Sequence, residues 1–388
     1  MKRSILLSSM MLAGMASGTA HAEPMEVALL QEAIFSGKTS LDLRLRAEWA
    51  DYDNATHEAN AETLRTVLGY KTGDYHGVKA FLEFEDVSNM GHENYNSTVN
   101  GNVGYGVIAD PQVTQVNQAY LEGYGFKAGR QKIIFDNARF VGDVAWRQND
   151  QTFDAIGYTN TTLLKDLAVT LDYVSKIHPI NGVVKGVRAP MVNVRYAGYP
   201  AAKFAVFYYG VDEQYTPANS WEHAGARVDG VIKDFLYEAS YADQDQYQQG
   251  TTKGSSYRDL QVGYKFGPVT LKVQQEVLKQ GFKTPLATLH AFNGWADRFL
   301  ATPANGLEDT NIKLMAKLAD YSFVLAAHDF QSDANSDDYG QEVDFSVSKP
   351  LTSKLTMLVK AASFNADGKT VGFTNDTTKA WVQFAYKM

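Results

Sequence analysis

Apolar and charged side chains alternate along residues 39–52. The segment reads TSLDLRLRAEWADY, so Leu, Ala and Trp occupy one phase while Asp, Arg and Glu occupy the other. A β-strand projects successive side chains to opposite faces, and this segment therefore predicts a strand with one apolar and one charged face. In a soluble sandwich the apolar face would cover a core. In a membrane barrel it would meet lipid, and the charged face would line a wet lumen.

The same alternation returns along the rest of the chain. It predicts further strands near 61–72, 78–85, 115–124, 126–134, 151–159, 167–177, 190–198, 203–212, 222–230, 234–243, 257–266, 269–278, 308–319, 321–331, 339–348, 354–364 and 377–387. With the first strand these make about 18, an even number within the range of bacterial barrels.

The predicted connections alternate between short and long. Short links fall at 73–76, 124–126, 199–202, 267–268, near Asp320 and at 349–353. Long links fall at 86–114, 135–150, 178–189, 244–256, 279–307 and 365–376. Outer-membrane barrels combine short periplasmic turns with longer external loops. The chain is therefore predicted to be all-β, a transmembrane antiparallel barrel of the bacterial outer-membrane type.

The N-terminus predicts export. Lys2 and Arg3 precede a mostly apolar run at 5–15, and Ala20-His21-Ala22 resembles a cleavage site. This combination is typical of a secretory signal peptide, cleaved here after Ala22. The expected organisation is a signal peptide at 1–22, a periplasmic segment at 23–38 and the barrel at 39–388. The periplasmic segment is expected to form either a short amphipathic helix or a flexible leader.

Composition narrows the functional classes. Lys and Arg number 36 against 44 Asp and Glu, which argues against a nucleic-acid binder. Cysteine is absent, so disulfides and thiolate metal sites are excluded. No lipase, metalloprotease or nucleotide-binding motif is recognisable in the sequence. We therefore expect no catalytic residues, no metal and no cofactor.

Several segments resemble the alginate-export porin family. They are SGKTSLDLRLRAEW at 36–49, VNQAYLEG at 116–123 and, most specifically, KAGRQKIIFDNARFVGDVAWRQNDQTFDA at 127–155. The resemblance extends over nearly the whole chain after the signal peptide. It implies an outer-membrane barrel of about 18 strands with an arginine-lined lumen. In the best-known branch of the family, the polymer that passes is an anionic uronate polysaccharide.

Charged residues on the polar phase of the predicted strands are candidates to line the pore. They are Asp42, Arg44, Arg46, Glu48, Arg65, Glu83, Glu85, Glu122 and Arg130. Arg139 and Arg147 lie in the segment 135–150, which we expect to fold inward as a constriction. Because guanidinium groups bind carboxylates bidentately, such arginines either attract anions or pair with acidic residues of the wall.

The sequence allows two predictions for the ion selectivity of the constriction. Cationic Arg139 and Arg147 would favour anions. Asp136, Asp143 and Asp150 in or beside the same segment would, if paired with them, leave a weakly selective pore.

These observations favour a porin-like channel that passes charged solutes or an anionic polysaccharide, such as a uronate polymer, by passive diffusion. The alternatives are a barrel enzyme of the lipase or protease type, a soluble periplasmic binding protein, and a sugar-uptake porin unrelated to polymer export. The expected partners are outer-membrane lipid and lipopolysaccharide, the transported solute, and the barrel assembly machinery, which would recognise the aromatic-rich last strand. Nucleic acid is not an expected partner.

Overall fold

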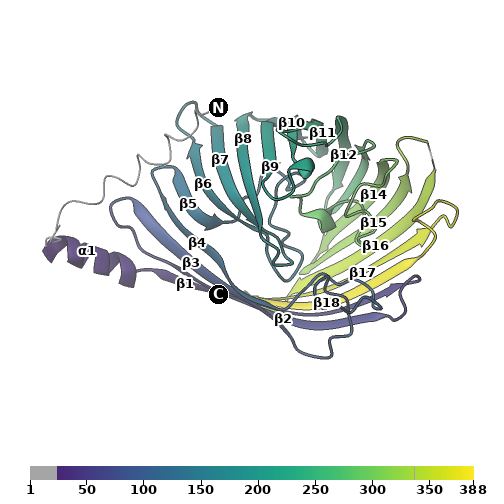
Figure 1. The fold of residues 1–388 in the computed structure, drawn as a ribbon, viewed down its shortest axis with the longest axis horizontal. Coiled ribbons are helices and arrows are strands. Elements are labelled where there is room, and N and C mark those ends of the chain that lie inside the picture. Colours follow the sequence, from purple (N-terminus) through teal and green to yellow (C-terminus); the bar gives the residue numbers. More distant parts are fainter. Residues whose placement is uncertain (1–23, 336) are drawn as a thin grey trace.

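The strands form one closed antiparallel sheet. The computed structural model describes residues 24–335 and 337–388. Its sheet has 18 strands, and it closes because β1 pairs with both β2 and β18. Each other strand pairs with its neighbours in sequence, so the chain is a simple meander (Figure 1). The predicted fold class and strand number are confirmed.

The elements match the predicted segments closely. A helix, α1 (Pro24–Phe35), precedes the barrel. The strands are β1 Lys38–Tyr52, β2 Ala59–Lys71, β3 Val78–Asn89, β4 Val113–Gly123, β5 Phe126–Gln131, β6 Thr152–Asn160, β7 Leu167–His178, β8 Lys185–Tyr199, β9 Ala202–Glu213, β10 Trp221–Ile232, β11 Phe235–Gln246, β12 Ser255–Phe266, β13 Val269–Leu278, β14 Leu307–Leu318, β15 Tyr321–Gln331, β16 Asp338–Pro350, β17 Leu355–Ala366 and β18 Thr377–Lys387. Short 3₁₀ turns lie at Pro217–Asn219 and Leu289–Ala291.

The segment at 23–38 contains a helix, as one of its two expectations stated, but the helix is not amphipathic, because its apolar side chains lie on all sides. The predicted signal peptide and its cleavage after Ala22 lie outside the described residues. Among residues 24–335 and 337–388, no helix has the length and apolar character needed to cross a membrane.

The barrel wall has an apolar outer face and a charged inner face. In β1, Leu45 is 44% exposed, whereas the adjacent Arg46 is only 1% exposed. Large apolar side chains are exposed on the outer phase of other strands too, including Leu68, Leu82, Phe84, Leu121, Val206, Leu260, Leu314, Leu325, Val343 and Val382. In an outer-membrane barrel such a belt faces hydrocarbon. The alternation along each strand therefore matches a wall with lipid on its outer face and water or polar protein groups on its inner face.

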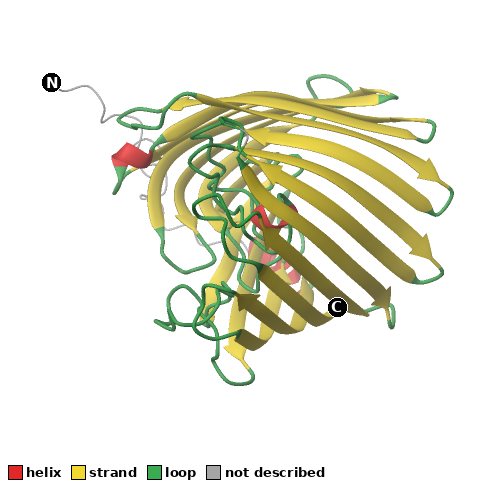
Figure 2. Cartoon of the chain, turned by 90° about the vertical axis from the view of Figure 1, so that its right-hand side faces the viewer, coloured by secondary structure: helices red, strands yellow, loops and turns green. Residues whose placement is uncertain are grey.

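The long connections fill much of the barrel. Short turns such as 72–77 join strands at one end, and the longer links lie at the other. Parts of the links at 90–112, 132–151 and 279–306 lie inside the ring of strands, where Asp110, Arg147 and Asp297 meet beside β1, and we call these links the first, second and third inner loops. Figure 2 shows loop segments inside the ring. The predicted inward fold of segment 135–150 therefore belongs to a larger loop assembly.

The outward position of Leu45 makes a testable prediction about stability. Replacing Leu45 by Arg should cost about 2–4 kcal/mol of barrel stability, because a cation would then sit near the middle of the bilayer. Thr39→Arg, on the same face of β1 but at its end, should cost only about 0–1 kcal/mol. Denaturant titration of the protein folded in vesicles measures both values. Equal costs for the two variants would contradict the position assigned to the apolar belt.

Candidate channel lumen

Two arginines of β1 hold the main chain of the second inner loop. The Nη1 group of Arg44 donates to the carbonyl oxygens of Ala145, Trp146 and Arg147 at 3.1, 3.3 and 2.9 Å. The Nη2 group of Arg46 donates to the carbonyl of Trp146 at 2.6 Å. Both arginines face the lumen and donate to backbone oxygens of the loop, and Arg46 also donates to the side-chain oxygen of Gln383 in β18 and lies 3.6 Å from Asp110. They position the loop across the barrel.

Arg147 joins the wall to all the inner loops. Its guanidinium lies 3.2 Å from Glu48 of β1, 3.5 Å from Asp110 of the first inner loop and 3.4 Å from Asp297 of the third. Arg147 is only 5% exposed. Burial alone would lower its pKa, but the facing carboxylates raise the pKa of Arg147 above its ordinary value. It therefore stays charged as a structural cation.

A second ion network fixes the end of the second inner loop. Asp150 lies 2.5 Å from Arg65 of β2 and 2.5 Å from Lys132. Arg65 also pairs with Glu85 at 3.0 Å and with Asp42 at 3.4 Å. Burial would raise the pKa of Asp150, yet Lys132 and Arg65 lower the pKa below its ordinary value. The network ties β1, β2 and β3 to one loop end.

Arg139 anchors the second inner loop to the opposite wall. Its Nε donates to Glu276 of β13 at 2.7 Å, and its Nη2 donates to Asn293 of the third inner loop at 3.0 Å. The guanidinium also lies 4.6 Å from the ring centre of Phe292. Arg139 is 2% exposed. Like Arg147, it is enclosed by protein partners.

The acidic residues within the segment pair with other cations. Asp136 lies 3.5 Å from Arg195 of β8, and Asp143 lies 3.5 Å from Lys132. The hypothesis that the segment's own aspartates neutralise Arg139 and Arg147 is therefore wrong. Arg139 is neutralised by Glu276 of the wall, and Arg147 is neutralised by carboxylates from the wall and from the other inner loops. The sequence separation of these partners made them invisible to local pattern analysis.

An aromatic cage encloses a lumenal lysine of β17. The Lys360 ammonium lies 3.6 Å from the ring centre of Trp295 and 4.1 Å from that of Trp146. It also lies 2.7 Å from Nε2 of His290, whose Nδ1 is 2.6 Å from Asp297. Burial lowers the pKa of His290 well below its ordinary value, so the ring is neutral. Its Nε2 then accepts from Lys360 while Nδ1–H donates to Asp297.

Two predicted carboxylates of the lumen have polar partners on nearby strands, those of Glu83 on the adjoining β4 and that of Glu122 on β2, across β3. Glu83 accepts hydrogen bonds from Asn117 and Gln118, both at 2.9 Å. Glu122 pairs with Lys71 at 2.5 Å. These residues lie on the inner face, as their strand phase predicts. Their contacts stiffen the wall, and their part in solute passage remains a prediction.

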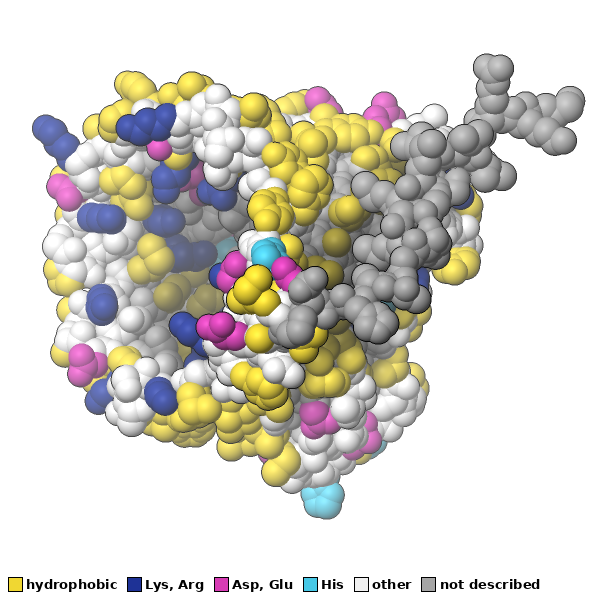
Figure 3. Space-filling view, turned by 90° about the vertical axis from the view of Figure 1, so that its left-hand side faces the viewer, with side chains coloured by type: hydrophobic (Ala, Val, Ile, Leu, Met, Phe, Trp, Pro, Cys, Tyr) yellow, Lys and Arg dark blue, Asp and Glu magenta, His cyan; other side chains and the backbone are white. Residues whose placement is uncertain are grey.

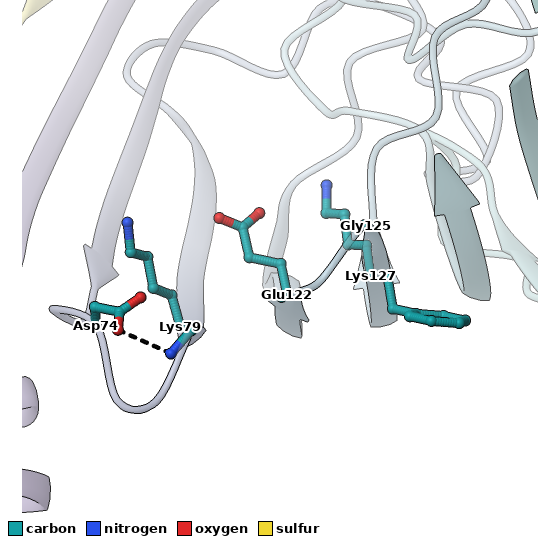
Figure 4. A pocket seen from close by; sticks show the side chains of 8 residues that line it. Asp74, Lys79, Glu122, Gly125 and Lys127 are labelled. Carbon is teal, nitrogen blue, oxygen red and sulfur yellow. Dashed lines mark hydrogen bonds between the residues drawn. The ribbon is translucent and has the colours of Figure 1, made fainter. Parts of the chain in front are cut away.

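A shallow cavity near the short-turn end contains some of these charges. Asp74, Lys79, Glu122 and Lys127 help line a space of 370 Å³. Figure 4 shows Lys79, Glu122 and Lys127 projecting in the same direction from neighbouring strands. The Lys127 ammonium lies 4.0 Å from the ring centre of Tyr120. Cations and anions therefore alternate along this part of the rim.

Arg130 does not face the lumen. In the short strand β5 it shares its phase with Phe126, which is 52% exposed on the outer face. Arg130 pairs with Asp154 of β6 at 3.0 Å on that outer side. The lumenal prediction for Arg130 is therefore wrong. Because polar residues occupy both phases of β5, alternation alone could not distinguish its two faces.

The sequence analysis missed a group of lumenal lysines. On the inner phase of β9, β12, β13 and β14 lie Lys203, Lys265, Lys272, Lys313 and Lys317. Within the described parts of the chain, none of their ammonium groups has a carboxylate oxygen within 4.0 Å. Figure 3 shows a hollow on the side of the molecule that carries α1, with Lys and Arg gathered along one wall.

Lys272 and Lys313 are direct cross-strand partners. Like charges placed opposite each other in a sheet repel, so the pair favours an anion between them. On the other side, Lys272 pairs with Gly263. A Cβ at Gly263 would come within 2.9 Å of Cγ of Lys272, so glycine leaves room for the lysine stem. The alternation of Thr270, Lys272 and Gln274 with apolar neighbours was the available sequence signal.

The geometry defines the class of fold, a transmembrane β-barrel of the bacterial outer-membrane type whose lumen is partly filled by loops. No protein-family model and no curated protein sequence matches the chain. Solved structures do share the fold. OccAB1 of Acinetobacter baumannii superposes with a TM-score of 0.70 at 12% identity, covering 92% of this chain and 98% of that one.

Other similar structures agree with this assignment. OccK3 (OpdO) of Pseudomonas aeruginosa has a TM-score of 0.70 at 10% identity, covering 94% of this chain and 99% of that one. OccAB2 of Acinetobacter baumannii has a TM-score of 0.66 at 14% identity, covering 92% and 99%. At such identities the likeness shows the fold alone. It supports the barrel expected from the alginate-export resemblance and does not support that branch in particular.

The burial of Arg147 predicts a strong effect of its removal. Arg147→Ala leaves Glu48, Asp110 and Asp297 with less compensation, and removing one partner of a buried ion pair typically costs about 3–5 kcal/mol. We expect faster hydrogen exchange in all the inner loops and a noisier, larger conductance. Arg188→Ala is the matched control, because its side chain is 66% exposed and its partner Asp212 lies on β9 and not in an inner loop. Unchanged inner-loop exchange in Arg147→Ala would contradict the anchoring role.

Proposed function

We propose that the protein is a passive outer-membrane channel for the uptake of small anionic solutes, such as monomeric sugar acids. The apolar outer belt suits lipid, and the charged inner face suits water. The observation that carries the proposal is the group of lumenal lysines without carboxylate partners, with Lys272 and Lys313 at its centre. Ammonium groups along a path lower the barrier for anions.

The arginines support this function indirectly. Arg65, Arg139 and Arg147 are neutralised by carboxylates, so they add little net positive potential to the path. Their role in the proposal is to hold the inner loops in place. The lysines then provide the selective charge. This division replaces the expectation that Arg139 and Arg147 select anions themselves.

The inner loops favour a small solute over a polymer. Arg139 and Arg147 fix the second inner loop to opposite walls of the barrel, at β13 and β1. A polysaccharide chain would require this network to open. A single sugar acid would require only the space beside the second inner loop. Uptake of small solutes therefore fits the structure better than export of a uronate polymer.

The proposal predicts a selective effect of the lysine pair. The double variant Lys272→Gln/Lys313→Gln should lower the anion-to-cation permeability ratio. A unit charge at 4 Å in water contributes about 1 kcal/mol, which corresponds to roughly a fivefold change per lysine at closest approach. Reversal potentials in planar bilayers under a salt gradient measure the ratio, and swelling of proteoliposomes in galacturonate measures passage of a sugar acid.

The matched control is Lys176→Gln/Lys369→Gln, which removes the same formal charge from exposed positions outside the lumen. It should leave the permeability ratio unchanged. Cation preference in the parent protein would overturn the proposal. An equal fall in both double variants would show that the effect is one of net charge and not of the lumenal site.

A further inference from the structure

Helix α1 exposes apolar side chains around its whole circumference. Its sequence, PMEVALLQEAIF, contains no Lys or Arg. The exposed apolar residues are Met25 (71%), Val27 (43%), Leu29 (39%), Leu30 (44%), Ile34 (43%) and Phe35 (83%). A helix that is apolar on all sides is normally buried, so the surface of α1 needs an apolar partner in the working protein.

The C-terminal end of α1 lies on the outer side of the barrel wall. The hydroxyl of Tyr70 in β2 donates to the carbonyl of Ile34. Tyr70 pairs with Thr39 of β1, and the outward Leu68, two residues before Tyr70 in β2, is 52% exposed. Tyr70 therefore belongs to the outer face. Its contact places the helix end beside the apolar belt and not beneath the lumen.

Further hydrogen bonds fix α1 to the rim of the barrel. The carboxylate of Glu26 accepts from the hydroxyl of Tyr75 at 2.9 Å and lies 3.2 Å from Nε2 of His76. The backbone N–H of Gly73 donates to the carbonyl of Ala33 at 2.7 Å. Both ends of the helix are thus held by the short turn 72–77. Figure 1 shows α1 continuing from the start of β1.

The connection to β1 restricts where α1 can lie. Only Ser36 and Gly37 separate the helix from β1, which begins at Lys38. The outward phase of β1 then runs through Thr39 and Leu41 into the lipid-facing belt. The exposed apolar surface of α1 is therefore continuous with the surface that the membrane already covers.

We propose that α1 is an interfacial anchor that binds the periplasmic leaflet, with its apolar side chains at the boundary between headgroups and acyl chains. Interfacial helices bind through buried apolar area, supplemented by attraction of cations to anionic lipid. Because α1 contains acidic residues and no Lys or Arg, its binding depends on apolar burial and needs no anionic lipid. The inference concerns lipid contact and is independent of which solute passes.

The absence of cysteine from the chain allows a direct test. Leu30→Cys carries an environment-sensitive fluorophore, and the protein is folded into phosphatidylcholine vesicles. Leu45→Cys in the belt and Asp234→Cys in the exposed turn after β10 are the matched controls. Nitroxide on lipid headgroups should quench the Leu30 probe more than the Asp234 probe. Aqueous iodide should quench it less than the Asp234 probe.

Each other outcome overturns the proposal. Iodide quenching equal to that at Asp234 would place α1 in water. Shielding from both quenchers would show that protein, such as a second copy of the chain, covers the helix.

A second variant tests whether the apolar surface is the cause. With the probe moved to Ile34→Cys, Val27→Asp/Leu30→Asp should abolish headgroup quenching. Heat-modifiable migration on gels and the ion selectivity of the channel should stay unchanged, since neither depends on α1. Persistent headgroup quenching would show that the barrel, and not the helix surface, sets its position. Loss of selectivity would show that α1 affects the ion path, and it would contradict the statement that the two proposals are independent.

Discussion

A buried guanidinium has to be compensated, and this requirement at Arg147 organises the lumen. Glu48, Asp110 and Asp297 surround it, and they come from β1 and from the first and third inner loops. A buried charge without partners costs several kcal/mol, so the loops are held where these carboxylates meet. The strands enclose the lumen. The ion network holds the inner loops in place and so determines which part of the lumen is filled by protein and which part is left for water.

In the channel that we propose, the two kinds of cation in the lumen consequently have different tasks. Arginine presents a planar fork of donors that satisfies several acceptors at fixed angles, and Arg44 uses it on consecutive backbone carbonyls. Lysine is a point charge on a flexible stem, which adapts to a passing anion. The formal net charge of −8 does not contradict an anion path. Many of the lumenal carboxylates are already paired with arginine or with Lys132 and Lys379.

Alternation predicted the wall well because lipid imposes one simple condition on it. Each outward residue of a strand such as β1 must be apolar, whichever apolar residue it is. The pattern therefore predicted the number of strands, their order and the alternating lengths of their links. It failed at Arg130 because β5 has only 6 residues and polar side chains on both phases. There the register with β4 and β6 assigns the face, and the sequence alone does not give that register.

The candidate site was harder to predict, because its contacts join residues far apart in sequence. Arg139 reaches Glu276 across 137 positions, and no local spacing indicates that partner. Lys272 and Lys313 were accessible in principle, since both lie on the polar phase of predicted strands and pair in register. Their pairing depends on the register between β13 and β14, which the alternation of each strand alone does not give.

The contrast between a wall constrained only by lipid and a lumen constrained by specific partners explains why similar folds persist at very low sequence identity. Structures that share only 10–14% of residues with this chain still superpose with TM-scores of 0.66–0.70. Lipid constrains the class of each outward residue and leaves its identity free, so sequences diverge while the barrel remains. The lumen is constrained differently, because every buried charge there needs a particular partner. Lumenal residues must therefore be substituted in compensating sets. Differences in these sets can give barrels of the same shape different solute preferences.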